Sequence, residues 1–111
     1  MAVSTQSDTV TVLRLSGDLG LSDMQDLVRV LNGLALENKN RVVLNFRRVR
    51  HVSLNAIALL ADRNRRFQDM GGEIKLASLI PYVANLFKLV GAFNVFDVVA
   101  DEDEAAARFE S

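Results

Sequence analysis

The chain has 111 residues, half of them hydrophobic, and a formal net charge of −1 at pH 7. This length is typical of one domain with a core of its own, and we expect a single domain over residues 1–111. The absence of cysteine and the single histidine, His51, exclude disulfides, thiol chemistry and clusters of histidine ligands. The charge balance argues against a nucleic-acid-binding domain, which is typically basic.

No apolar run approaches the roughly 20 residues that span a bilayer. The first ten residues have neither the basic nor the apolar region of a signal peptide. We therefore expect a cytoplasmic protein that does not insert into a membrane.

The N-terminal part of the chain predicts two strands and a helix. A β-branched stretch from Val10 to Leu15 predicts a strand that ends at residues 16–17, and a shorter strand at about 2–6 is expected to pair with it. Residues 22–25 fit a capping box that begins with Ser22. Apolar residues at helical spacing then predict a helix that ends near Glu37.

The middle of the chain predicts a buried strand, a basic connection and a second helix. Residues 41–46 are almost continuously apolar, as in strands buried on both faces. Residues 47–51 are expected to form a loop, and residues 54–70 a helix that ends at two glycines. We expect the second helix to turn one set of side chains inward (Ile57, Leu60, Ala61 and Phe67) and another mostly outward (Arg63, Asn64, Arg65 and Arg66).

The C-terminal part predicts a strand at Glu73–Ala77, a third helix, a short strand at 94–99 and a terminal helix at 101–109. Ser78 and Pro81 are expected to open the third helix, since proline suits the first helical turn, and Gly91 to end it. The four acidic residues at 101–104 could suggest metal binding, but helix capping and the helix dipole explain them better.

This alternation of strands and helices predicts an α/β fold with a mostly parallel sheet of four or five strands and helices mainly on one face. The strands at 41–46 and Glu73–Ala77 are expected to lie side by side and parallel at the sheet centre. The second helix is expected to cross between them.

Several short segments, taken in order, resemble the STAS family, and more closely its sporulation-type anti-sigma factor antagonists. The segments are 15–19 (an "L-x-G-x-L" strand end), 43–46, 49–60, 70–73, 78–86 and 89–93. The resemblance implies the STAS fold and a protein that binds an anti-sigma factor with a kinase-like ATPase fold and so displaces a sigma factor. It further implies that the anti-sigma factor phosphorylates one serine at the start of the second helix.

The residues at that phosphorylation site depart from the family motif, which is close to Asp-Ser-Ser-Gly-Leu. Ser53 takes the place of the aspartate, Leu54 that of the phosphoserine and Asn55 that of the second serine. Leucine has no hydroxyl, so the site is lost in this register and the protein is constitutively active or a scaffold. Two alternatives stay open: Ser53 is a displaced phosphosite, although serine also suits a helix N-cap, or the register is wrong by one. Helical phase favours the register, because a slip by one residue would rotate the inward side chains by about 100°.

Residues 47–51 are either a solvated connection or a basic patch that attracts an acidic partner. Gly20 is a further departure, because many relatives have an acidic residue there. We predict a partner-binding surface and neither catalysis, a cofactor nor a metal. Its residues are Gly20, Arg47, Arg48, Arg50, His51, Ser53, Leu54, Asn55, Ile57 and Arg63.

The alternative function is that of a structural STAS subunit in a stress-signalling scaffold or a lipid-transport ATPase complex. The partner is then another protein of the same pathway, and a weak homodimer also stays open.

Overall fold

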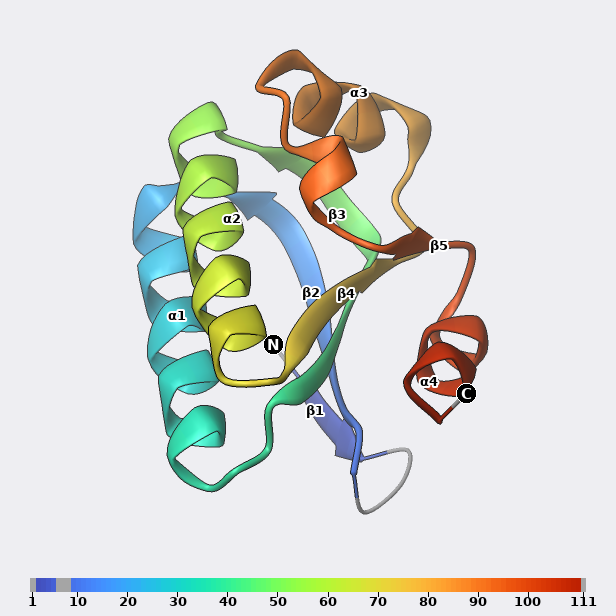
Figure 1. The fold of residues 1–111 in the computed structure, drawn as a ribbon. Coiled ribbons are helices and arrows are strands. Elements are labelled where there is room, and N and C mark those ends of the chain that lie inside the picture. Colours follow the sequence, from blue (N-terminus) through green and yellow to red (C-terminus); the bar gives the residue numbers. More distant parts are fainter. Residues whose placement is uncertain (1, 6–8, 111) are drawn as a thin grey trace.

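The computed structural model describes residues 2–5 and 9–110, which form five strands and four α-helices (Figure 1). One short 3-10 helix, Phe93–Val95, lies between the third helix and the last strand. The elements in chain order are β1 (Ala2–Thr5), β2 (Thr11–Leu19), α1 (Leu21–Leu36), β3 (Arg41–Val52), α2 (Leu54–Asp69), β4 (Glu73–Ala77), α3 (Pro81–Leu89), β5 (Val98–Val99) and α4 (Glu102–Glu110).

The strands form one sheet in the order β1-β2-β3-β4-β5. β1 pairs antiparallel with β2, and every other neighbouring pair is parallel. β3 and β4 pair from Arg41 opposite Glu73 to Asn45 opposite Ala77. The predicted parallel pair at the sheet centre, joined through α2, is therefore confirmed.

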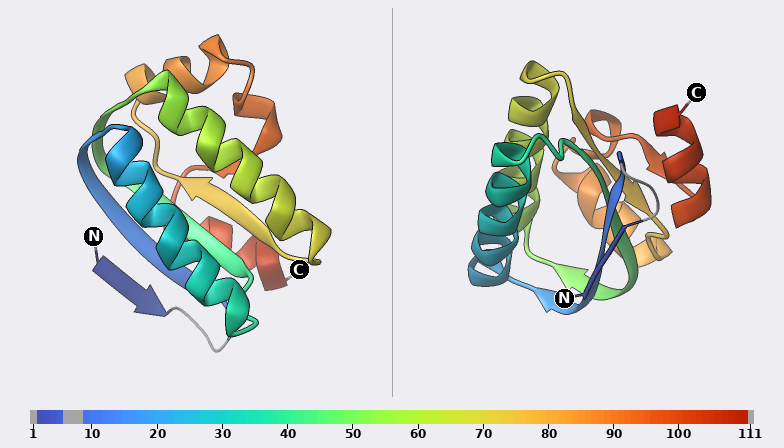
Figure 2. Two further views of the ribbon diagram at one scale, coloured as in Figure 1. Left: turned by 90° about the vertical axis from the view of Figure 1, so that its left-hand side faces the viewer. Right: turned by 90° about the horizontal axis from the view of Figure 1, so that it is seen from below.

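Helices cover both faces of the sheet unequally. Figure 2 shows α1 and α2 side by side over one face, with α4 on the opposite side. Val42, Leu44 and Phe46 of β3 belong to the larger core, which also includes buried residues of α1, α2 and α3. Val43 points to the smaller core beneath α4. The apolar run in β3 thus fills two cores, as expected for a strand buried on both faces.

At the helix starts the predicted proline is in place, but two predicted capping residues have other roles. Pro81 occupies the first turn of α3, as predicted. The expected cap at Ser22 is wrong, because α1 begins at Leu21 and the Gly20 amide donates to the Asp23 carboxylate at 3.0 Å. Ser78 does not cap α3 either; its hydroxyl donates to the Ala100 carbonyl at 3.0 Å.

Asn64 lies in the core and not on the outward side of α2. Its side chain has no solvent exposure. The Asn64 amide oxygen accepts from the Ile74 amide at 2.9 Å, and its nitrogen donates to the Val95 carbonyl at 3.2 Å. One polar side chain thus ties α2 to the start of β4 and to the 3-10 helix, and satisfies two backbone groups that would otherwise be orphaned.

The acidic residues at the start of α4 have structural partners. The Asp101 side chain accepts from the Glu104 amide at 2.9 Å, as an N-cap does. Glu102 accepts hydrogen bonds from Arg14 and Asn45. Its hydrogen bond and negative charge raise the pKa of Arg14 above the usual value. These contacts hold α4 on the sheet and agree with the capping interpretation.

Candidate functional site

β3 continues through the basic segment that the sequence predicted to be a loop. The strand runs from Arg41 to Val52 and pairs with β2 along its whole second half. From Arg14 to Leu19, β2 advances five residues while the paired stretch of β3, from Asn45 to Val52, advances seven. The extra residues form bulges, which increase the twist of a strand and turn its side chains. The loop prediction for residues 47–51 is therefore wrong.

The bulges change which side chains of β3 reach solvent. Phe46, Val49 and Val52 are buried, so burial recurs every third residue and not every second. The residues between them, Arg47, Arg48, Arg50 and His51, are all exposed. The bulges thereby bring four basic or ionisable side chains to solvent along the last part of β3, which leads into the start of α2.

The starts of α1 and α2 lie next to each other, at the carboxyl ends of the parallel strands β2 and β3. Leu19 pairs with Val52, and the Ser53 amide donates to the Leu19 carbonyl at 2.9 Å. Gly20 and Ser53 follow these residues as the N-caps of the two helices. The first residues of the helices, Leu21 and Leu54, are 44% and 47% exposed. Two helix N-termini and two leucine side chains thus share one region of the surface.

Ser53 is the N-cap of α2, as its residue type suggested. Its hydroxyl oxygen accepts from the Ala56 amide at 3.2 Å. Replacing Ser53 by alanine should lower the free energy of unfolding by about 1 kcal/mol, because an amide of the first turn loses its acceptor. Urea denaturation would measure the loss, and Ser53→Asp should retain most of the stability. An unchanged midpoint for Ser53→Ala would contradict a structural cap.

The arginines on the last part of β3 form no ion pairs within the described residues. Within residues 9–110, no carboxylate forms an ion pair with Arg47, Arg48 or Arg50. Arg14, Arg29, Arg66 and Arg108, which lie on other strands and helices, do form ion pairs. The three β3 arginines also line a shallow hollow with Val49 and Ile80. This part of the surface is therefore suited to an acidic ligand or partner.

Tyr82 adds to this region, and the sequence did not reveal it. The His51 ring nitrogen Nδ1 lies 3.0 Å from the Tyr82 hydroxyl, and the two rings stack with their centroids 5.9 Å apart. Tyr82 belongs to α3, and its side chain is exposed. The sequence indicates only that Tyr82 directly follows Pro81 in the first turn of α3, where a side chain can face solvent.

Two residues of the predicted binding surface lie elsewhere. Ile57 is fully buried in the larger core and contacts no solvent, because it belongs to the inward face of α2. Arg63 is half-buried, with its Nε atom buried and without a hydrogen-bond partner. It lies nine residues beyond Leu54, about 14 Å along the helix. The surface prediction was wrong for Ile57, and Arg63 does not join the cluster at the helix start.

The remaining predicted residues come together. Asn55 is exposed beside Leu54 on α2. We define the docking face as the exposed or half-exposed residues at the starts of α1 and α2 and on the last part of β3, together with Tyr82. Its members are Gly20, Leu21, Arg47, Arg48, Arg50, His51, Ser53, Leu54, Asn55 and Tyr82.

The described part of the chain has neither a metal site built from acidic or histidine side chains nor a membrane-spanning helix. Among residues 9–110, no group of three or more histidine, aspartate or glutamate side chains is placed to hold a metal ion. No helix in the described part of the chain is both long enough and apolar enough to cross a bilayer.

Comparison with known proteins gives a family and several relatives. The STAS domain model matches residues 1–105. BtrV of Bordetella bronchiseptica, described as a candidate anti-sigma factor antagonist, is 28% identical over 107 residues, which cover 94% of this chain and 90% of BtrV.

Two solved structures resemble the fold closely. The anti-sigma factor antagonist SpoIIAA of Bacillus, in its unphosphorylated form, superposes with a TM-score of 0.82 at 20% identity and covers 98% of this chain and 95% of SpoIIAA. A Thermotoga maritima protein, also described as a candidate anti-sigma factor antagonist, has a TM-score of 0.89 at 14% identity and covers 99% and 94%. These observations, with the sheet order and helix placement above, show that the chain belongs to the STAS domain family.

Proposed function

We propose that this chain is a cytoplasmic anti-sigma factor antagonist that acts by exchanging protein partners and catalyses no reaction of its own. Its membership of the STAS family and its likeness to BtrV support this proposal. The observation that carries it is a cluster of three β3 arginines that form no ion pair within residues 9–110, on the strand that leads into the exposed Leu54 at the start of α2. This combination suits protein recognition, because it offers both charge and apolar contact area.

The docking face supplies each component that a partner-binding surface needs. Arg47, Arg48 and Arg50 raise the rate of encounter with an acidic surface through long-range attraction. Leu54 and Leu21 provide apolar area, worth about 25 cal/mol per Å² removed from water before association costs. The free amides at the start of α2 can also receive a partner carboxylate.

We infer that the partner is an anti-sigma factor with a kinase-like ATPase fold. The test is co-purification of the untagged chain's complexes from the native cell, with identification by mass spectrometry. Recovery of such an anti-sigma factor with the wild-type protein, and its loss with Leu54→Asp, is the expected result. Recovery of only membrane-transport subunits or other STAS proteins would contradict the proposal and favour a scaffold role.

The protein is expected not to be switched by phosphorylation at Leu54. Leucine offers no acceptor oxygen, and the hydroxyl of neighbouring Ser53 accepts a hydrogen bond in capping α2. Incubation with the anti-sigma factor and ATP, followed by intact-mass analysis, should show no added phosphate. Stoichiometric phosphate on Ser53 would instead establish a displaced phosphosite.

Leu54→Ser provides the matched variant for this experiment. If only the acceptor residue was lost, the variant should gain one phosphate at position 54. Ser53→Ala in the same background distinguishes the two hydroxyls, because it removes the neighbouring acceptor and leaves position 54 intact. A Leu54→Ser protein that stays unmodified would show that Ser53 and Gly20, which replace acidic residues, also prevent phosphorylation.

A further inference from the structure

The outer edge of β2 is covered along only half of its length. β1 pairs with β2 from Thr5 opposite Thr11 to Ala2 opposite Arg14. Within the described residues, no strand pairs with the Leu15–Leu19 half of β2 on that side. Figure 2 shows β1 beside one end of the long, curved β2. An open strand edge of this kind can receive a further strand from another chain.

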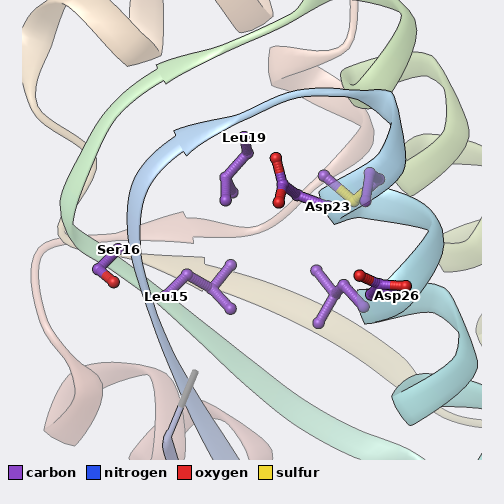
Figure 3. Close-up of a pocket in the computed structure, with 7 residues that line it drawn as sticks. Leu15, Ser16, Leu19, Asp23 and Asp26 are labelled. Carbon is purple, nitrogen blue, oxygen red and sulfur yellow. The ribbon is translucent and has the colours of Figure 1, made fainter.

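A hollow of about 210 Å³ lies beside this open edge, between β2 and α1. Figure 3 shows Leu15 and Leu19 projecting from β2 toward α1, and Asp23 and Asp26 on the helix. The apolar lining comes from Leu15, Leu19, Met24 and Leu27. A cavity of roughly 150 Å³ can hold a benzene-sized group, so the hollow has room for one long side chain.

The rim of the hollow is acidic. Asp23 and Asp26 line it, and Asp18 is exposed on the adjoining part of β2. Asp23 accepts from the Gly20 amide through Oδ2, and its other oxygen has no hydrogen bond within the described residues. The opposing cation is Arg29, which pairs with Asp26, but both side chains are more than half exposed. Such a surface pair is worth little and exchanges easily for another cation.

An apolar lining beneath carboxylates fits a lysine or arginine, whose alkyl stem packs on apolar surface while its charged end stays at the rim. We propose that the β2–α1 hollow binds a lysine or arginine side chain of a partner segment that adds as a strand along Leu15–Leu19. Gly17, in the middle of this edge, has a φ of +83°, and the β2–β3 ladder shifts register on both sides of it, so the edge suits only a short partner segment. The site lies on β2 and α1, whereas the arginines of the docking face lie on β3.

The experiment uses capped heptapeptides of serine, threonine and valine with a central lysine or arginine, and the ¹⁵N-labelled full chain. The protein must carry no N-terminal tag. β1 places Ala2 opposite Arg14, so a tag could lie along the same edge of β2 and block it. The basic peptides should shift the amide resonances of residues 15–19 and 23–27 and slow hydrogen exchange within 15–19. No perturbation of these residues at 5 mM of any basic peptide would overturn the proposal.

Matched controls separate charge from strand addition. A peptide with central glutamate should bind at least tenfold more weakly, and Asp26→Lys should weaken the basic peptides tenfold or more. Asp69→Lys changes the net charge equally at the exposed end of α2 and should leave binding unchanged. Equal binding of the glutamate peptide, or equal effects of both variants, would contradict the site. N-acetyl-lysine amide provides the side chain without a strand. If it shifts the same resonances as much as the basic peptides do, and the peptides do not slow hydrogen exchange within 15–19, strand addition is contradicted. No anti-sigma factor takes part, so the outcome is independent of the proposed function.

Discussion

Replacing Arg47, Arg48 and Arg50 together by glutamate is expected to slow association with the anti-sigma factor about 100-fold at low ionic strength. Electrostatic steering changes association rates by roughly 10 to 1,000-fold, and the three guanidinium groups have no ion-pair partner within residues 9–110 that would reduce their field. The dissociation rate should change much less, because such charges act mainly on the encounter. Stopped-flow or surface-binding kinetics over a series of salt concentrations would measure the effect.

Folding should be almost unaffected, since exposed substitutions usually alter stability by less than about 0.5 kcal/mol. The matched control replaces Arg29, Lys39 and Arg65 by glutamate, which changes the net charge equally on exposed positions outside the docking face. If the control variant slows association equally, the effect comes from net charge alone and not from the position of the β3 arginines. An unchanged association rate for the β3 variant would exclude this strand from the interface.

Asn64→Ala is expected to lower the free energy of unfolding by about 3 kcal/mol. The substitution leaves the buried Ile74 amide without its acceptor and the Val95 carbonyl without a donor. A buried polar group that loses its partner costs about 1–3 kcal/mol, and the truncated side chain adds a small void. Because domains are stable by only about 5–15 kcal/mol, urea denaturation should show a clear shift in midpoint.

Gln68→Ala is the control within the same helix, because Gln68 is exposed and its side chain makes no hydrogen bond within the described residues. Its midpoint should match that of the wild type. A loss below about 1 kcal/mol for Asn64→Ala would mean that water replaces the amide. Asn64→Leu should not restore stability, because leucine fills the volume and still leaves both backbone groups unpaired.

The sequence predicted most of the fold, because the signals are local. Alternating strand and helix patterns gave the parallel pairing of β3 with β4, since a crossover helix joins neighbouring strands in most such folds. Ser53 and Pro81 marked the starts of α2 and α3 through the geometry of a single helical turn. The inward side chains of α2 follow from its 3.6-residue period, and Leu60 and Phe67 are buried as expected.

Part of the candidate site was also predictable. The family resemblance and the absence of a hydroxyl at Leu54 drew attention to the start of α2, and the basic run at 47–51 was visible in the sequence. The structure places these residues together with Gly20, because Leu19 and Val52 pair at the ends of adjacent strands. The inclusion of Ile57 failed, since closeness in sequence to an exposed residue says little about which side of a helix a residue occupies.

The remaining features depend on partners that are distant in the chain. A bulge in β3 has no signature in its own residues, because the extra residues exist only relative to the pairing with β2, and the basic segment therefore resembled a loop. Asn64 is buried because Ile74 and Val95 offer it a donor and an acceptor, and Tyr82 joins the docking face because α3 packs near the end of β3. The sequence alone determined the order of the elements and the loss of a hydroxyl at Leu54. Only the tertiary structure decided which polar side chains reach solvent, since burial depends on the surfaces that other elements bring against them.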